Sequence, residues 1–373
     1  MEYSRDMPAV APADWNARGT VLSSTDQTPF DLSKLPAGTS AKKFVYQSIS
    51  GITGAPTVVG GAVFVPGGTP PPGGWPVIGN AHFTTGVVPD CGTLEDPQLS
   101  GLITGVDDLL GQGYAVAYTD YAGLGEAATA EGQVHAYLEP KSEAFNLIDA
   151  VTATRSLVPE LSNRWVAYGG SQGGQAAWAA AEYFPSYGAP TELLGAVALA
   201  PALDITGIGA LAEESTLDND QKAIWPVLIA GLAAVDPGID PDDFMTGALR
   251  QGLGAVVACR GPNAEHQQAA VDQVTDDDFT ISSPEAAARL VSRLESYSLP
   301  HRRTPIPILA MYGGIDSLIS PEWTEDALDR ACALGDVITT VRLSDQGHAV
   351  DPGDIDDRWI AARFADQPAE SNC

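Results

Sequence analysis

The stretch Tyr168-Gly169-Gly170-Ser171-Gln172-Gly173-Gly174 decides the fold of this 373-residue chain. It places a Gly-x-Ser-x-Gly motif between an apolar segment, 165–168, and an alanine-rich segment, 172–184. Glycines two positions before and after the serine permit a sharp turn from strand to helix. Such a turn presents the serine hydroxyl at the edge of a sheet, where the N–H groups of the following helix favour negative charge. A phosphate-binding turn would carry a lysine, which is absent here. Ser171 is therefore the predicted nucleophile.

Short apolar runs on both sides of this motif predict a mostly parallel sheet. Continuous runs, expected for strands with helices on both faces, occupy 76–81, 114–119, 165–168, 194–199, 306–312 and 337–343. Two earlier segments, 44–50 and 57–66, alternate apolar and small residues and predict an antiparallel pair. Helical patterns separate the runs at 142–157, 172–184 and 322–333. This alternation predicts an α/β-hydrolase fold, with an eight-stranded, mostly parallel sheet and helices on both faces.

The interval 204–300 interrupts the alternation of strands and helices. It contains helical patterns, for example at 224–234 and 284–297, but no convincing strand, and it is too long to be a loop. We predict that 204–300 is an inserted helical cap over the carboxyl edge of the sheet, where ligands of open α/β folds bind. The rest of the chain is then an irregular segment, 1–40, and an α/β-hydrolase core, 41–203 and 301–373.

A nucleophilic serine needs a neighbouring base, which in turn needs an orienting acid. In this fold the acid and then the histidine follow the serine along the chain. Of the five histidines, only His348 lies beyond the last predicted strand, so it is the predicted base. Asp316, four residues beyond the strand at 306–312 and behind two glycines, is the predicted acid. Asp204, which follows the strand at 194–199, is the alternative acid.

The oxyanion that forms when the serine attacks requires two preorganised N–H donors. Gln172, the residue after the nucleophile, is predicted to supply one of them. The second donor is expected from Thr85, or alternatively Thr84, in the loop after the strand at 76–81. The remaining alternative is that these threonines only cap a turn.

Four further residues are candidates for lining the substrate pocket: His82, Phe83, Tyr121 and Trp225. A purely structural role is the alternative for Tyr121. Trp225 belongs to an apolar stripe at helical spacing in the cap, with Ile224, Leu228, Ile229 and Leu232. This stripe either forms an acyl-binding site or packs against other helices.

The charge and apolar content of the chain limit its partners. The chain has 48 acidic and 19 basic residues, a formal net charge of −29, and this charge repels nucleic acid and anionic membranes. It has no run of 18 apolar residues, so neither a membrane span nor stable membrane anchoring is expected.

The cysteines indicate the compartment. Cys91, Cys259, Cys332 and Cys373 include no Cys-x-x-Cys pair, which excludes a zinc ribbon or a thioredoxin-like motif. Two disulfides in an oxidising compartment, and hence a secreted protein, are our interpretation, and four buried thiols are the alternative. The N-terminus lacks an apolar signal core, so we expect that a signal peptide is absent from this chain.

Together, several short motifs resemble the secretory lipase family, and in particular its bacterial secreted branch. They are the serine motif, Asp120–Gly125, His135–Leu138, Gly314–Asp316 and Gly347–His348, and the resemblance extends from about residue 40 to Cys373. It implies an α/β-hydrolase core with a helical cap, carboxylic-ester substrates and no cofactor. It also implies the disulfides Cys91–Cys259 and Cys332–Cys373. The chain departs from the usual oxyanion loop of lipases at Phe83, where glycine is usual.

We therefore predict a secreted serine carboxylic-ester hydrolase, a lipase or esterase, that uses a Ser171–Asp316–His348 triad and needs no cofactor or metal. Its expected partners are small-molecule esters or lipids such as acylglycerols. The alternatives on the same fold are an acyltransferase, a peptidase and a non-catalytic binding protein. The presence of all three triad residues argues against the last of these.

Overall fold

The computed structural model describes residues 3–188 and 190–373, in which nine strands form one sheet. The order of the strands across the sheet is β1-β2-β3-β5-β4-β6-β7-β8-β9. Pairs β1–β2, β2–β3 and β3–β5 are antiparallel, and the five remaining pairs are parallel. The strands span Val21–Thr25, Ser40–Ile49, Pro56–Val65, Trp75–Ala81, Ala115–Thr119, Leu161–Gly170, Glu192–Leu199, Ile308–Gly313 and Ile338–Leu343, from β1 to β9. The predicted α/β-hydrolase fold is confirmed, with one strand more than the eight expected.

The additional strand, β1, lies in the segment 1–40, for which the sequence predicts only irregular structure. This segment also contains helix α1 (Pro12–Ala17) and the 3₁₀ turn η1 (Leu32–Lys34). Strand β1 is the edge strand beside β2, and four of its five residues are exposed. A strand that buries so little carries almost no apolar pattern, which is why the sequence did not indicate it.

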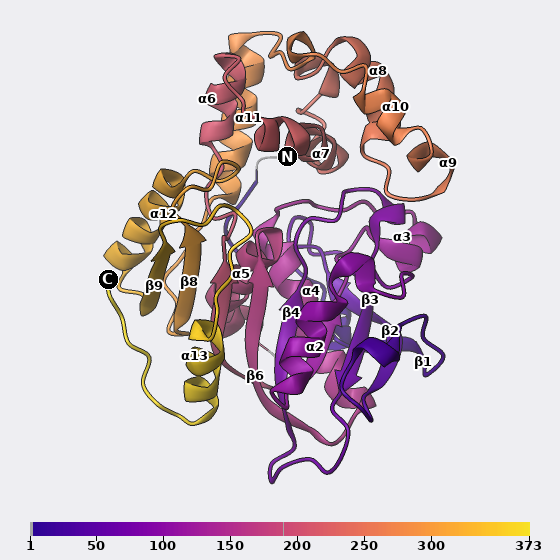
Figure 1. Ribbon diagram of the computed structural model, residues 1–373, viewed down its shortest axis with the longest axis vertical. Helices are drawn as coiled ribbons and strands as arrows, with labels where there is room; N and C mark the ends of the chain where they lie inside the picture. The colour runs from indigo at the N-terminus through magenta and orange to yellow at the C-terminus, as the bar shows by residue number, and fades with distance from the viewer. Residues whose placement is uncertain (1–2, 189) are drawn as a thin grey trace.

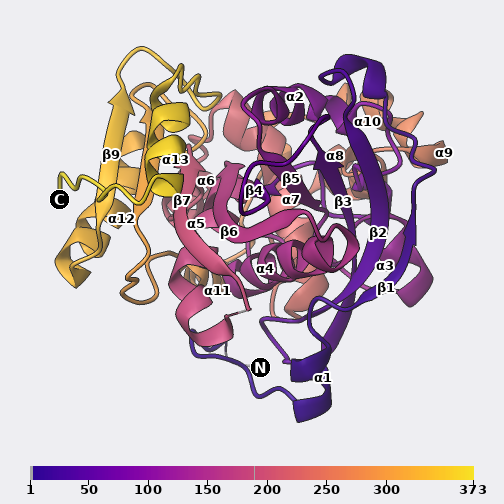
Figure 2. The ribbon, with the colours of Figure 1, turned by 90° about the horizontal axis from the view of Figure 1, so that it is seen from below.

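Helices cover both faces of the sheet (Figure 2). Helices α2 (Ile103–Gly111) and α13 (Ile355–Phe364) pack on one face, where they share a hydrophobic cluster with Val116, Val166 and Val197. Helices α4 (Pro140–Leu157), α5 (Gln172–Tyr187) and α12 (Pro321–Leu334) pack on the other face. Burial on both faces explains why the central strands are continuously apolar.

The interval 204–300 is helical, and in it the structure describes no strand. Its elements are α6 (Gly207–Glu213), α7 (Asn219–Val235), η4 (Pro241–Asp243), α8 (Gly247–Val256), α9 (Gly261–Ala264), α10 (Gln267–Val271), η5 (Asp276–Asp278) and α11 (Pro284–Tyr297). They gather at the top of Figure 1, above the sheet, and contribute most of a third hydrophobic cluster. Local signals begin the two longest helices of this interval: Asp218 and Gln221 form a capping box at the N-terminus of α7, and Ser283 caps α11.

The connection between β4 and β5 holds the 3₁₀ turns η2 (Pro89–Cys91) and η3 (Leu99–Gly101). Helix α3 (Gly125–Glu131) follows β5. Disulfides join Cys91 to Cys259 and Cys332 to Cys373, the two pairs that the family resemblance implies. In the part of the chain that the structure describes, no helix combines the length and apolarity that a membrane span requires.

Candidate active site

Ser171 lies in the sharp turn between β6 and α5. Its backbone has a φ of +54° and a ψ of −117°, a conformation that residues other than glycine rarely adopt. A Cβ atom at Gly169 would lie 2.2 Å from the carbonyl oxygen of Gly173, and one at Gly173 would lie 2.0 Å from that of Ala81. These contacts are the physical reason for both glycines of the motif. The strained turn is consistent with a functional site.

Ser171, His348 and Asp316 are brought together from three separate loops. The Nε2 atom of His348 lies 2.9 Å from the Ser171 hydroxyl oxygen, and its Nδ1 atom lies 2.8 Å from Asp316 Oδ2. The other Asp316 oxygen accepts hydrogen bonds of 2.9 Å from the backbone N–H groups of Leu318 and Ile319. Because the carboxylate accepts, Nδ1 carries the imidazole proton, and Nε2 is free to accept from the serine.

The alternative acid, Asp204, is engaged elsewhere. Its Oδ1 accepts from the backbone and hydroxyl of Thr206, and its Oδ2 lies 2.8 Å from the Arg330 guanidinium. It makes no hydrogen bond to His348 among the described residues. The geometry therefore favours Asp316 over Asp204 as the acid that orients His348.

A cavity of about 640 Å³ opens above Ser171 and His348. Its wall combines core residues from loops at the sheet edge with cap residues, and among the described residues no Asp, Glu, Lys or Arg lines it. The lining includes Asn80, Ala81, His82, Phe83, Thr84, Leu102, Thr104, Tyr137, Leu138, Tyr168, Leu199, Ile205, Ile208, Ile224, Leu318, Ile319 and Val350. The site is therefore an uncharged, mainly apolar chamber next to the serine.

Two of the four pocket candidates, His82 and Phe83, line this cavity, whereas Tyr121 and Trp225 do not. Tyr121 is fully buried and donates its hydroxyl proton to the His82 carbonyl. Trp225 is also fully buried and donates its indole N–H to the Phe244 carbonyl within the cap. Helical periodicity identified the buried face of α7, but of its stripe only Ile224 reaches the cavity.

The predicted oxyanion donors belong to two elements, helix α5 and the loop after β4, and of the three residues only Thr84 lines the cavity. Gln172 is the first residue of α5, and its side chain is buried away from the cavity. Thr84 lines the cavity, and its hydroxyl lies 2.8 Å from the Tyr137 hydroxyl. The hydroxyl oxygen of Thr85 is buried and has no hydrogen-bond partner among the described residues.

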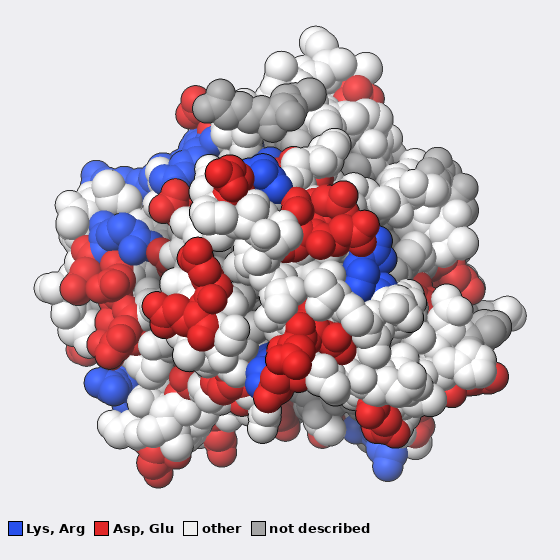
Figure 3. Space-filling model, turned by 90° about the horizontal axis from the view of Figure 1, so that it is seen from above, with Lys and Arg blue, Asp and Glu red and all other residues white. Residues whose placement is uncertain are grey.

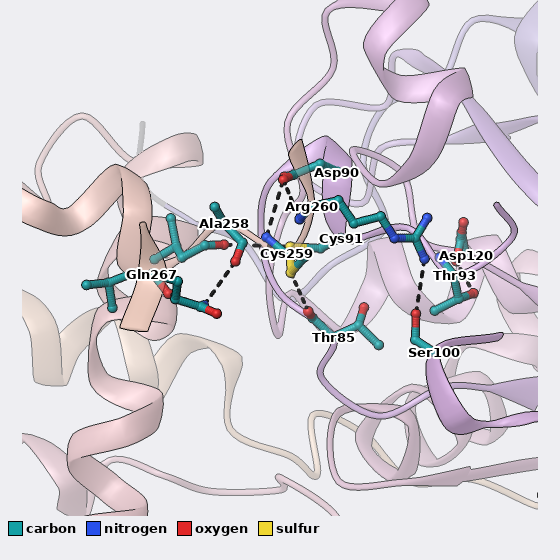
Figure 4. The surroundings of a disulfide bond; sticks show 12 residues. Thr85, Asp90, Cys91, Thr93, Ser100, Asp120, Ala258, Cys259, Arg260 and Gln267 are labelled. Carbon is teal, nitrogen blue, oxygen red and sulfur yellow. Dashed lines mark hydrogen bonds between the residues drawn. A yellow bond between two sulfur atoms is a disulfide. The ribbon is translucent and has the colours of Figure 1, made fainter. Parts of the chain in front are cut away.

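The Cys91–Cys259 disulfide contacts the loop that holds these threonines (Figure 4). The sulfur of Cys259 lies 3.0 Å from the carbonyl oxygen of Thr85. A Cβ atom at Gly86 would lie only 2.2 Å from the sulfur of Cys91. The disulfide thus joins the loop after β4 to the cap.

Sequence patterns did not indicate several parts of this cavity. Leu102 and Thr104, at the start of α2, and Val350, after His348, approach it from segments distant in the sequence. Leu318 and Ile319 had a usable signal, because they directly follow the predicted acid. No group of three or more His, Cys, Asp or Glu side chains in 3–188 and 190–373 is arranged to hold a metal ion.

Residues 98–245 match the model of the secretory lipase family. The resemblance to the secretory lipases is confirmed. The match supports a hydrolase activity of the lipase or esterase kind. A search of curated proteins gives no match.

Three solved structures share the fold with this secretory-lipase-like chain. Candida antarctica lipase A in its closed state has a TM-score of 0.75 at 15% identity, over 98% of this chain and 86% of that one. The rice cell wall degrading esterase LipA from Xanthomonas oryzae, in a ligand-bound form, has a TM-score of 0.67 at 20% identity, over 94% of this chain and 95% of that one. A putative hydrolase from Legionella pneumophila has a TM-score of 0.65 at 16% identity, over 88% of this chain and 93% of that one. At these identities the likeness establishes the fold.

Proposed function

We propose that this protein is a secreted serine carboxylic-ester hydrolase that cleaves acyl esters, including acylglycerols, through an acyl-enzyme on Ser171. The observation that carries the proposal is the hydrogen-bonded series Ser171–His348–Asp316 at an apolar cavity, with distances of 2.9 and 2.8 Å. Secretion is supported by the two disulfides and by the family match.

In the acylation step, the Ser171 oxygen attacks the ester carbonyl carbon while its proton passes to His348 Nε2. The carbonyl π electrons move to oxygen, and a tetrahedral oxyanion forms. When this intermediate collapses, the bond to the alcohol oxygen breaks and the alcohol takes the proton from His348. Asp316 holds the imidazole in the required tautomer and stabilises its cationic form.

In the deacylation step, a water molecule attacks the acyl-enzyme and gives one proton to His348. The collapse of the second intermediate breaks the bond to the Ser171 oxygen, which takes that proton back. The products are a carboxylic acid and free enzyme. The same three side chains therefore serve both steps.

Both oxyanions need donors that are in place before the reaction. We assign one to the backbone N–H of Gln172, at the N-terminus of α5, and the other to Thr85, with Thr84 as the alternative. The buried hydroxyl of Thr85, which has no partner among the described residues, supports the first choice, because such a group is costly without a hydrogen bond. The position of Thr84 in the cavity lining, where Thr85 is absent, supports the alternative. One such donor contributes about 3 kcal/mol to transition-state stabilisation.

The cavity favours uncharged, apolar acyl groups. In the described part of its wall there is no Asp, Glu, Lys or Arg side chain to compensate a desolvated charge on the acyl group. Its volume of about 640 Å³ is within the range of small-molecule sites. Ile205, Ile208 and Ile224 of the cap region would contact the acyl chain.

The test is hydrolysis of a chain-length series of p-nitrophenyl esters, with Ser171→Ala as the control. We expect turnover by the wild-type protein, with kcat/KM rising from acetate to longer acyl chains, and loss of turnover in Ser171→Ala. No hydrolysis of any ester, or transfer to an added alcohol in preference to water, would overturn the proposal.

A further inference from the structure

The segment His135–Leu138 is one of the motifs that carry the family resemblance, yet the proposed chemistry does not use it. Three of its residues are buried: His135, Tyr137 and Leu138 are each less than 5% exposed. The segment lies between the serine turn and the loop after β4. It therefore contacts both elements that supply the proposed oxyanion donors.

On one side, the segment holds the side chain of Gln172. The Gln172 Nε2 atom lies 2.8 Å from His135 Nε2. The other nitrogen of His135, Nδ1, lies 3.1 Å from the Ala122 carbonyl oxygen, which can only accept. Nδ1 therefore carries the proton, and Nε2 accepts from Gln172. Burial lowers the pKa of His135 to about 3, so the ring is neutral and this tautomer persists near neutral pH.

Glu143, in the first turn of α4, accepts a hydrogen bond from the second N–H of the Gln172 amide. Its Oε1 atom accepts from Gln172 Nε2 at 2.7 Å and from the backbone N–H of Leu138 at 2.9 Å. One carboxyl oxygen thus links the residue after the nucleophile to the cavity wall. Glu143 is buried and forms no ion pair among the described residues, and burial raises its pKa well above the ordinary value. The Oε1 atom of Glu143 therefore acts as a buried acceptor for two N–H groups.

On the other side, aromatic hydroxyls hold the loop after β4. Tyr137 contacts the Thr84 hydroxyl at 2.8 Å. Tyr121 stacks on the His135 ring, with centroids 5.4 Å apart and an interplanar angle of 17°, and donates to the His82 carbonyl at 2.7 Å. The same buried cluster therefore contacts both helix α5, at Gln172, and the loop after β4, at His82 and Thr84.

We propose that His135, Tyr137 and Glu143 are positioning residues that hold Gln172 and the loop at Thr84 and Thr85 in the geometry of the oxyanion hole. This inference rests on the proposed function. Its physical basis is that oxyanion donors stabilise the transition state only if they need not reorganise during the reaction. The Gln172 side chain is held by two acceptors, His135 Nε2 and Glu143 Oε1, and this keeps the Gln172 backbone in place. The Tyr137 hydroxyl, through its contact with Thr84, does the same for the loop after β4.

The test compares Glu143→Gln, Glu143→Leu and Tyr137→Phe with the wild-type protein in p-nitrophenyl ester hydrolysis. Glutamine keeps an acceptor oxygen, so we expect Glu143→Gln to retain kcat within about threefold. Leucine removes the acceptor, and we expect kcat to fall about 100-fold, the scale of losing one oxyanion donor. Tyr137→Phe should lower kcat about tenfold. In all three variants KM should change less than about threefold, because the apolar cavity binds the acyl chain.

Asp149→Leu is the matched control for Glu143→Leu. Asp149 is a buried carboxyl on the same helix, and its partners, Ser48 and Tyr187, do not line the cavity. We expect this control to lower the melting temperature but to leave kcat near the wild-type value below the transition.

The outcomes separate this inference from the proposed function. If wild-type protein is inactive, the proposed function fails, and with it the positioning role. If wild-type protein is active but Tyr137→Phe keeps wild-type kcat, the positioning network alone is overturned. It is also overturned if Glu143→Gln loses as much kcat as Glu143→Leu, because an acceptor would then not be sufficient.

Discussion

Asp316 and Asp204 each follow a strand of the parallel sheet, but their surroundings differ. The Oδ1 atom of Asp316 is held by two backbone N–H groups, which leaves Oδ2 directed at the imidazole of His348. Both oxygens of Asp204 are already engaged, one by Thr206 and the other by Arg330. A group can orient a catalytic base only if one of its acceptors is free for that base.

This difference predicts the effect of two matched substitutions. Asp316→Asn should lower kcat by roughly 10⁴-fold, because an amide cannot select the imidazole tautomer as a carboxylate does. Asp204→Asn should lower the melting temperature, because it removes the ion pair with Arg330, but should change kcat by less than about threefold. Steady-state kinetics with one p-nitrophenyl ester checks both. Near-full activity in Asp316→Asn would remove it from the triad.

At the scale of elements, the sequence predicts those parts of the fold that are buried on both sides. The run 194–199 matches the apolar part of β7 (Glu192–Leu199), and 76–81 matches β4 (Trp75–Ala81) within one residue. The edge strand β1 was missed because it is mostly exposed. For the candidate site, the serine motif and the order of acid and histidine along the chain were enough to predict the three triad residues. Trp225 was wrongly predicted to line the pocket, because helical periodicity indicates which face of a helix is buried but not what packs against that face.

The two disulfides tie different elements and should have different consequences. Cys332–Cys373 joins α12 to the C-terminal segment across 41 positions, and neither cysteine lines the cavity, although the loop that the bridge closes contains His348 and Val350. Closing such a loop is worth roughly 4 kcal/mol in the chain-entropy account. Cys91–Cys259 instead contacts Thr85 and Gly86, in the proposed oxyanion loop.

We therefore expect the two cysteine-to-serine double variants to separate stability from activity. Cys332→Ser with Cys373→Ser should lower the melting temperature and leave kcat unchanged. Cys91→Ser with Cys259→Ser should lower both, because the loop at Thr85 loses the contact that holds it. Both are assayed well below their melting temperatures. Wild-type kcat in the second variant would show that the disulfide does not position the loop.

At the scale of the whole molecule, acidic side chains are spread over the surface while several ionisable groups are buried. Figure 3 shows Asp and Glu in separate patches across the cap side, with basic side chains between some of them. In the interior, burial raises the pKa of Asp149 to about 7 and that of Glu182 to about 8. Burial also lowers the pKa of His135 and His301 to about 3. These groups make the stability of the fold depend on pH in a direction that can be derived.

Between about pH 6.5 and 8.5, the buried carboxyls decide the direction. His135 and His301 are neutral when folded, and as the pH rises above their unfolded pKa of about 6.5 they become neutral in the unfolded chain as well. Asp149 and Glu182 titrate near 3.8 and 4.5 when unfolded but near 7 and 8 when folded. The folded protein therefore holds protons that the unfolded chain has released. The free energy of unfolding falls as pH rises through the folded pKa values, by at most about 1.4 kcal/mol per pH unit for each group.

The melting temperature should accordingly decrease from pH 6.5 to 8.5, and Asp149→Asn should reduce this decrease. Asparagine keeps an acceptor for Ser48 and Tyr187 but has no proton to lose, so its melting temperature should rise relative to wild type as pH increases. The control is Asp345→Asn at an exposed position, whose profile should run parallel to wild type. If the melting temperatures of Asp149→Asn and wild type change in parallel with pH, Asp149 is already ionised in the folded protein at pH 6.5. Any remaining decrease of the melting temperature with pH would then come from Glu182 or the surface charge.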